Sequence, residues 1–339
     1  MSIFVTGGAG FIGSQFIRDW VAANPGELVI NFDALTYAGN LENLVSVATS
    51  PNYRLVKGDI CDEGAVLAAL PDDCEAVVHF AAESHVDRSI LSATEFVKTN
   101  ILGTQVLLDI ARHKKVGRFL HISTDEVGGS MEPHQWFTED MPLNPSSPYA
   151  ASKTAAEHMV RAAAHTFGFG TIITRTSNNY GPYQFPEKLL PLAISNAIQG
   201  APIPVYGDGM QERDWIHVAD NCRALMLVLK KGRLGETYHI GGKNPLPNLE
   251  VLRTLLRVVG QPESLLTHVT DRLGHDRRYA VDCTKILNEL GWQPEIPFAE
   301  GLTATVAWYR DNQDWVRRAR SGEYKNYYQK MYGESLDKA

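Results

Sequence analysis

The sequence predicts a doubly wound α/β fold, in which helices cover both faces of a parallel sheet. Short, near-continuous apolar runs alternate with longer helical patterns through the first half of the 339-residue chain, as in strands that are buried on both faces. A glycine-rich turn at residues 7–13 joins the first apolar run to the first helical pattern. Beyond residue 180, prolines and glycines interrupt the alternation, which indicates a second and smaller unit.

Each expected element has a length typical of this class. The expected strands are residues 3–6, 28–32, 53–57, 76–80, 119–123 and 171–174. The expected helices between them are residues 14–23, 65–70, 95–112 and 149–167. A later helical pattern at residues 217–230 is apolar enough to pack back on the sheet. The Trp- and Tyr-rich segment 298–332 has the pattern of helices with a loop.

The regular alternation of strand and helix patterns breaks down in the second half of the chain, which predicts two domains with a cleft between them. We expect a cofactor-binding domain over residues 1–178, with a returning segment at about residues 214–240. Residues 179–339 are expected to form mainly the substrate-binding domain. Ligand sites occur preferentially at such domain boundaries.

The composition is that of an ordinary soluble protein, with 44% hydrophobic and 21% charged residues. The net charge of −7 argues against nucleic acid or an anionic membrane as the main partner. The four cysteines, at positions 61, 74, 222 and 283, have neither metal-ligand nor redox spacing. Neither a basic leader nor a long apolar run is apparent, so we expect a cytoplasmic protein with free thiols, no bound metal and no membrane partner.

The glycine-rich turn is expected to bind a dinucleotide. Gly7, Gly10 and Gly13 lack side chains, so the backbone can turn tightly and approach a pyrophosphate at the N-terminus of a helix. Asp33 ends the second strand twenty residues after Gly13. A carboxylate there accepts hydrogen bonds from a ribose and repels a 2′-phosphate, which favours NAD over NADP. The alternative is an ordinary glycine turn with a capping aspartate.

Two further strand ends are candidates for the cofactor cleft. Asp59 and Ile60 follow the third strand, where they can contact an adenine edge, although Asp59 taken alone is an ordinary strand-end aspartate. Ala81 and Ala82 follow the fourth strand, where small side chains let the backbone pass close to a cofactor. Tight helix–sheet packing explains that alanine pair equally well.

A tyrosine and a lysine on one helix are the first candidate catalytic pair. Tyr149 and Lys153 are one helical turn apart and share a face. We expect the ammonium group and a nicotinamide cation to lower the pKa of the tyrosine toward neutrality. A tyrosinate can then remove the proton from a hydroxyl while hydride leaves the same carbon. The same spacing also occurs on helices by chance.

Adjacent carboxyls at the end of the fifth strand are the second candidate group. Thr124, Asp125 and Glu126 lie where the carboxyl end of a strand faces the ligand crevice. A threonine hydroxyl there can hydrogen-bond a substrate oxygen. Like charges held close raise one pKa, so one carboxyl stays protonated as an acid while the other is ionised as a base. Alternatively, the pair only caps the next segment.

Together these motifs resemble those of the extended short-chain dehydrogenase/reductases and, within them, of the dTDP-glucose 4,6-dehydratases. Matching segments run from residue 6 to about residue 292, nearly the whole chain. ISTDEV at 122–127 and SNNYGPY at 177–183 are typical of the dehydratase branch, because sugar-nucleotide epimerases usually lack the Asp-Glu pair. The other matching segments are residues 6–14, 33–40 (DALTYAGN), 58–62 (GDICD), 79–90 (HFAAESHVDRSI), 147–153 (SPYAASK), 185–191 (FPEKLLP), 213–215 (RDW), 235–242 (GETYHIGG) and 274–279 (GHDRRY).

The resemblance implies a nucleotide-sugar 4,6-dehydratase that uses NAD. Tyr149 would take the proton from the sugar O4 as the C4 hydride passes to NAD, and Lys153 would contact the nicotinamide ribose. Glu126 would remove the C5 proton, which the C4 ketone acidifies, and Asp125 would protonate the C6 hydroxyl as it leaves as water. Return of the hydride to C6 would give a 4-keto-6-deoxy sugar. Thr124 would hydrogen-bond the O4 region.

The resemblance also assigns binding residues. Besides Tyr149 and Lys153, the residues on the cofactor side are Gly7, Gly10, Phe11, Ile12, Gly13, Asp33, Ala34, Leu35, Thr36, Asp59, Ile60, Ala81, Ala82, Ser84, Thr99 and Asn179. The residues on the nucleotide-sugar side are Ser84, His85, Thr124, Asn178, Lys188, Leu189, Pro204, Val205, Tyr206, Arg213, Asn248, His275, Arg277 and Tyr279.

Few of the substrate residues carry a chemical signal of their own. Arg213 and Arg277 suit a diphosphate, because guanidinium pairs with phosphate oxygens bidentately. Tyr206 can stack on a pyrimidine. Each arginine taken singly also fits a surface ion pair, and His275 taken singly fits a structural histidine.

One position departs from the pattern of the resemblance. The related sequences usually read DEVYG, whereas this chain reads DEVGG, with Gly128 in place of the aromatic. Loss of an aromatic beside the acid–base pair would widen or loosen the pocket. We name Trp136 and Phe137 as the residues that can fill the space.

Two alternatives fit the same cofactor site. An NAD-dependent nucleotide-sugar 4-epimerase would give a product of unchanged mass, and a non-catalytic NAD-binding sensor would bind without turnover. The resemblance further implies a homodimer that associates through the helices around residues 95–112 and 149–167. The sequence leaves open which nucleotide base and which hexose are used.

Overall fold

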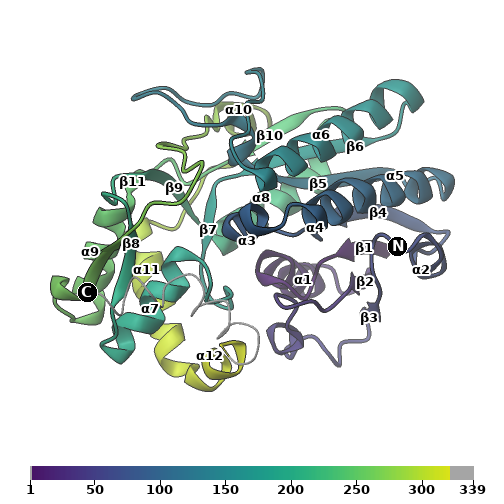
Figure 1. Cartoon of the computed structure of the whole chain (residues 1–339). Coiled ribbons are helices and arrows are strands. Elements are labelled where there is room, and N and C mark those ends of the chain that lie inside the picture. Colours follow the sequence, from purple (N-terminus) through teal and green to yellow (C-terminus); the bar gives the residue numbers. More distant parts are fainter. Residues whose placement is uncertain (1, 321–339) are drawn as a thin grey trace.

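The core of the molecule is a seven-stranded parallel sheet with the strand order β10-β6-β5-β4-β1-β2-β3. The structure, a computed structural model, describes residues 2–320 (Figure 1). The order reverses direction between β1 and β4, and this reversal creates a crevice at the carboxyl ends of the strands. The strands of this sheet are β1 Ser2–Thr6, β2 Leu28–Asp33, β3 Tyr53–Lys57, β4 Cys74–His79, β5 Arg118–Thr124, β6 Thr171–Thr176 and β10 Thr237–Ile240.

The predicted fold class is confirmed, because this sheet has helices on both faces. Alternate side chains of β1 enter different apolar clusters: Ile3 and Val5 pack with α1 and α8, whereas Phe4 packs with α2, α5 and α6. Strands buried in this way lose the polar alternation of a one-sided sheet. The helices of this part are α1 Phe11–Ala23, α2 Glu63–Ala69, α3 Val86–Leu91, α4 Thr94–Phe96, α5 Thr104–His113, α6 Pro148–Phe167 and α8 Val218–Lys231.

The helix predicted over residues 95–112 is interrupted. A π-helical turn, Val97–Gly103, separates α4 from α5. Asn100 on this turn donates to the Glu83 carbonyl at 3.0 Å and to the Ser152 hydroxyl at 2.8 Å, and it accepts from the Glu83 N–H at 2.8 Å. These contacts tie the turn to the segment after β4 and to α6. Such turns often lie at functional sites.

The second half of the chain forms a smaller body with its own apolar core. Leu190, Val205, Leu252 and Leu302 belong to that core, together with Trp315. A three-stranded sheet, β11-β9-β7, and a two-stranded sheet, β12-β8, lie in this region. The elements are β7 Asn178–Tyr180, α7 Leu189–Gln199, β8 Ile203–Tyr206, β9 Glu212–His217, β11 Pro245–Pro247, α9 Asn248–Val259, β12 Leu266–Val269, α11 Phe298–Asp311 and α12 Gln313–Ala319. The helix α10, Thr284–Leu290, packs instead against β10 and α8 of the larger body. Short 3₁₀ turns occur at Leu41–Leu44 (η1), Asp125–Gly128 (η3) and Glu263–Leu265 (η4).

The chain returns to the large sheet late in the sequence. α8 packs beside α1, and β10 pairs in parallel with β6 at the edge of the sheet. The division into two domains near residue 178 stays a prediction. The expected tail pattern at 298–332 corresponds to α11 and α12 as far as residue 320, and its remainder lies outside the described residues. In the described part of the chain, none of the helices is both long and apolar enough to cross a bilayer.

Candidate functional site

One large cavity, of about 530 Å³, opens at the carboxyl ends of β1, β2, β4 and β5 and continues into the smaller body. Its position at the reversal of strand order is the usual place for a ligand in this class of fold. Most of the predicted site residues line it, and these include both candidate catalytic groups. The three exceptions are Leu35, Val205 and Arg277.

The glycine-rich turn is built for close approach of backbone. A Cβ on Gly13 would lie 2.5 Å from the carbonyl oxygen of Gly7, and a Cβ on Gly7 would lie 2.5 Å from the nitrogen of Ala81. Gly7 also has a φ of 70°, which only glycine adopts readily. α1 begins directly afterwards at Phe11, so its free N–H groups face the cavity and suit a pyrophosphate.

Asp33 is held in place at the end of β2. Its carboxylate accepts hydrogen bonds at 2.8 Å from the N–H groups of Ala9 and Leu35. Burial raises its pKa, and these two hydrogen bonds oppose the rise. Ala34 and Thr36 line the cavity beside it. The arrangement fits a carboxylate that receives ribose hydroxyls.

Leu35 is the one predicted cofactor residue that does not line the cavity. Its backbone has a φ of 54°, and its side chain packs against the core cluster that contains α1. Because the backbone N–H of Leu35 bonds Asp33, the residue supports the site without facing it.

Tyr149 and Lys153 lie on the first turns of α6 and are both buried. The helix is capped by the Ser147 hydroxyl, which accepts from the Ala150 N–H at 3.1 Å. Lys153 donates from Nζ to the Ile122 carbonyl at 2.7 Å. Burial lowers the pKa of Lys153 to about 8, while the charge of Glu157 opposes the change.

The expected lowering of the tyrosine pKa is not found among the protein groups alone. Burial raises the pKa of Tyr149, and the charges of Glu126 and Asp125 raise it further, whereas a hydrogen bond with Thr124 lowers it. Desolvation disfavours the phenolate more strongly than the Thr124 hydrogen bond favours it. Ionisation of Tyr149 therefore needs an additional positive charge in the cavity.

The adjacent carboxyls occupy the turn η3 directly after β5. The Thr124 hydroxyl accepts from the Glu126 N–H and donates to Asp125 Oδ1, both at 3.3 Å. Asp125 Oδ2 is buried and has no hydrogen-bond partner among the described residues. A buried polar atom without a partner costs free energy, so this oxygen is a candidate for contact with a substrate.

The two carboxyls have different surroundings. Burial raises the pKa of Asp125 well above its usual range, and the charges of Glu126 and Asp214 raise it further. Burial also raises the pKa of Glu126, but the cations Arg272, Lys188 and Arg213 oppose the rise. Asp125 is therefore suited to remain protonated as an acid, and Glu126 is the better base, as the sequence predicts for such a pair.

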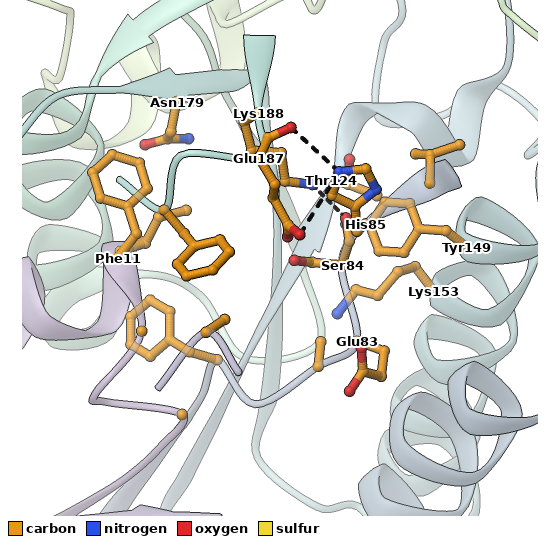
Figure 2. A pocket seen from close by; sticks show the side chains of 18 of the residues that line it. Phe11, Glu83, Ser84, His85, Thr124, Tyr149, Lys153, Asn179, Glu187 and Lys188 are labelled. Carbon is orange, nitrogen blue, oxygen red and sulfur yellow. Dashed lines mark hydrogen bonds and ion pairs between the residues drawn. The ribbon is translucent and has the colours of Figure 1, made fainter. Parts of the chain in front are cut away.

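A polar cluster with side chains from both bodies lines the same cavity (Figure 2). Lys188 donates to the Ser84 carbonyl at 2.6 Å, and Arg88 bonds Glu187 at 3.3 Å. His85 Nε2 lies 3.3 Å from the carbonyl oxygen and 3.9 Å from a carboxylate oxygen of Glu187. The sequence reasoning missed Glu187 as a site residue. Its position beside Lys188 was the available signal.

The end of the cavity in the smaller body is lined by six of the predicted substrate residues, Pro204, Tyr206, Arg213, Asn248, His275 and Tyr279, and also by Arg272. Arg272 lies 3.4 Å from Asp87, whose other carboxylate oxygen accepts from the Tyr206 hydroxyl at 3.1 Å. Burial and the charge of Arg272 lower the pKa of His275 to about 4. The structure therefore places two arginines, Arg213 and Arg272, where a diphosphate can be bound.

Two predicted substrate residues point elsewhere. Arg277 is exposed and pairs with Asp208 at 2.9 Å, whereas Arg272 lines the cavity. Val205 lies between two lining residues on β8, and its side chain is buried in the core of the smaller body. Successive residues of a strand face opposite sides, which explains why Pro204 and Tyr206 line the cavity and Val205 does not.

The space left by Gly128 is filled by Phe137. A Cβ on Gly128 would lie 2.7 Å from a ring carbon of Phe137, which is almost fully buried. Trp136, the other residue proposed for this space, is instead 38% exposed and lies near the Arg278 guanidinium. The acid–base turn, which is η3 with Asp125 and Glu126, is therefore closely packed against Phe137.

The fold and the site define an extended short-chain dehydrogenase/reductase. A model of the GDP-mannose 4,6 dehydratase family matches residues 4–305. The dTDP-glucose 4,6-dehydratase of Streptomyces niveus is 51% identical over 325 residues, which cover 95% of this chain and 96% of that protein. The chain belongs to this family of nucleotide-sugar 4,6-dehydratases.

Solved structures agree with this assignment. The dTDP-glucose 4,6-dehydratase of Streptomyces venezuelae, solved with NAD and dTDP bound, is 50% identical and has a TM-score of 0.92. The match covers 94% of this chain and all of that chain. The UDP-glucose 4-epimerase of Thermotoga maritima is more distant, at 30% identity and a TM-score of 0.86, with 92% of this chain and all of that chain covered.

Proposed function

We propose that the chain is an NAD-dependent nucleotide-sugar 4,6-dehydratase that converts dTDP-glucose, or a close relative of it, to the 4-keto-6-deoxy sugar and water. The single observation that carries the proposal is the pair of unlike carboxyls, Asp125 and Glu126, placed on the same cavity as Tyr149 and Lys153. The dehydratases also match this chain at higher identity than the epimerase does.

Each reacting residue of the cavity has a separate role in the proposed dehydration. Tyr149 takes the proton from the sugar O4, and Lys153 on the same helix face holds positive charge beside it. When bound, NAD would accept the C4 hydride, return it to C6 and add positive charge near the phenol. Glu126 removes the proton at C5, and Asp125 gives its proton to the departing C6 hydroxyl. Glu126 then returns a proton to C5, which balances the hydride that comes back to C6. Thr124 orients the O4 region from the end of β5.

The ends of the cavity match the parts of the two ligands. The glycine turn, Asp33 and Ala81 fit a dinucleotide, whose pyrophosphate would lie at the N-terminus of α1. Arg213 and Arg272 fit the diphosphate of the sugar nucleotide, and Tyr206 fits its base. The predicted lining residues keep these roles as parts of the proposal. The division into an NAD domain and a substrate domain near residue 178 is part of it too.

The mass of the product tests the proposal against its alternative, an NAD-dependent 4-epimerase. Dehydration lowers the mass of the sugar nucleotide by about 18 Da, because one water leaves in the acid-assisted step. The purified protein is incubated with NAD and dTDP-glucose, and the product is analysed by mass spectrometry. We expect the lighter product. A product of unchanged mass contradicts the dehydratase and supports the epimerase.

We further propose a homodimer and a cytoplasmic location. Leu91, Val97 and Leu102 are each more than half exposed on α3 and the π-helical turn, near the helices expected to associate. Exposed apolar side chains that form a contiguous patch mark interaction sites. All four cysteines are free thiols, which fits a reducing compartment.

A further inference from the structure

A buried stack of side chains joins the acid–base turn to the helix that carries Tyr149 and Lys153. Phe137, at 1% exposure, lies in the middle of the stack. One side of its ring meets Gly128, the last residue of η3, so closely that a Cβ there would lie 2.7 Å away. Near the same ring, the Arg175 guanidinium lies 5.1 Å from the ring centroid and the His239 ring 4.8 Å from it.

Arg175 is a rigid support for this ring. Arg175 and Glu157 are both fully buried, and their closest nitrogen–oxygen distance is 2.8 Å. Neither partner of a buried ion pair can move away without leaving an uncompensated charge. Glu157 lies on α6, four residues after Lys153 and eight after Tyr149, so the three side chains share one face of the helix.

The backbone of Phe137 is held independently of its ring. Its N–H donates to the Ala280 carbonyl, and its carbonyl accepts from the Asp282 N–H, both at 2.8 Å. His239 Nδ1 lies 2.9 Å from the same carbonyl oxygen. Removal of the ring therefore leaves the segment anchored, so a substitution reports on the ring itself.

We propose that Phe137 is a positioning residue, whose ring fixes where η3 presents the carboxyls of Asp125 and Glu126 relative to Tyr149. This inference rests on the proposed dehydratase function. Misplacement of a reacting group by about 1 Å can slow its step on the order of a hundredfold. Oxidation at C4 relies on Tyr149 and Lys153, whereas elimination relies on Asp125 and Glu126 of η3. Loss of the ring therefore slows elimination selectively.

The test is a single-turnover reaction of Phe137→Ala with NAD and dTDP-glucose, with absorbance and product mass followed in time. We expect reduced nicotinamide to form at a near-normal rate and to accumulate, because elimination falls on the order of tenfold to a hundredfold. Phe137→Leu, which keeps most of the volume, should restore elimination. Phe169→Ala is the matched control, since Phe169 is buried against Phe119 in the other cluster. It should not cause accumulation.

A second pair of variants probes the contact from the other side. Gly128→Ala places a Cβ against the ring and should also slow elimination, and it carries the test if Phe137→Ala fails to fold. In the double variant Gly128→Ala/Phe137→Ala, the added Cβ no longer meets the phenyl ring. The elimination rate of the double variant should therefore fall by no more than that of the slower single variant. Fully multiplicative losses would contradict the inference.

Binding of dTDP, measured by calorimetry without any chemistry, separates positioning from general damage. Its affinity should stay within about twofold in all these variants, because Phe137 lies behind the turn and not in the cavity lining. The inference alone is overturned if dTDP affinity falls together with the elimination rate. It is also overturned if Phe137→Ala keeps the wild-type ratio of elimination to C4 oxidation while the wild-type enzyme releases water from the substrate. A wild-type enzyme that releases no water overturns the proposed function as well.

Discussion

At the scale of single residues, surroundings separate groups of the same chemistry. Asp125 and Glu126 are neighbours in sequence, yet Asp125 faces a second carboxylate, Asp214, while Glu126 faces the cations Arg272 and Lys188. Burial is the largest influence on the pKa of both groups and raises it, and the neighbouring charges raise that of Asp125 further while they oppose the rise for Glu126. In the proposed function, one strand end therefore supplies both an acid and a base from two carboxyl side chains.

Lys153 gives a prediction for stability against pH. Its pKa falls from 10.5 in the unfolded chain to about 8 in the folded protein because of burial. Its contribution to stability is therefore complete above pH 10.5 and is lost as the pH falls through about 8, with a slope of up to about 1.4 kcal/mol per pH unit. Urea unfolding of the ligand-free protein at about pH 7 and about pH 10 should show this increase relative to Lys153→Met. A difference that does not change with pH contradicts the assignment.

Residues identified by local spacing were predictable, and residues brought in by long-range packing were not. Gly13 and Lys153 have fixed offsets from a strand or a helix start, so the sequence places them. Arg272 and Arg277 lie five residues apart on a segment without regular structure, so no periodicity shows which one faces the cavity. Only the pairing of Arg277 with Asp208 and of Arg272 with Asp87 decides it.

At the scale of elements, the strands were the most predictable part. Runs such as that of β3, Tyr53–Lys57, were located to the residue, and the ends of β4 and β6 shifted by only one or two residues. The π-helical turn at Val97–Gly103 could not be predicted, because the Asn100 side chain bonds the segment after β4 and α6, which lie far away in sequence. The turn brings Lys98 and Thr99 to the cavity.

The same elements give a prediction for assembly. Leu102 on the π-helical turn is 52% exposed, and a charge placed in an apolar interface is costly. Leu102→Asp should therefore shift the proposed dimer toward monomer in sedimentation experiments. Leu234→Asp is the matched control, because Leu234 is also about half exposed but follows α8 on another part of the chain. Wild-type protein that sediments as a monomer contradicts the proposed dimer.

At the scale of the whole molecule, the site depends on two bodies that share one cavity. The parallel sheet and its helices carry the glycine-rich turn, Tyr149, Lys153 and the two carboxyls, and the smaller body supplies Lys188, Arg213 and Arg272. Contacts across the cleft, such as Lys188 with Ser84 and Tyr206 with Asp87, hold the two ends together. In the proposed function, a sugar held between them meets the phenol and both carboxyls at once, which is what an internal oxidation, elimination and reduction requires.

The most direct test of this account is the fate of the hydrogen at C4. The protein is loaded with NAD and given a mixture of dTDP-glucose deuterated at C4 and unlabelled dTDP-glucose. We predict that the deuterium appears at C6 of the same product molecule, with no exchange between molecules and no release of reduced cofactor. Deuterium in free NADH, or a product without label at C6, would contradict the account.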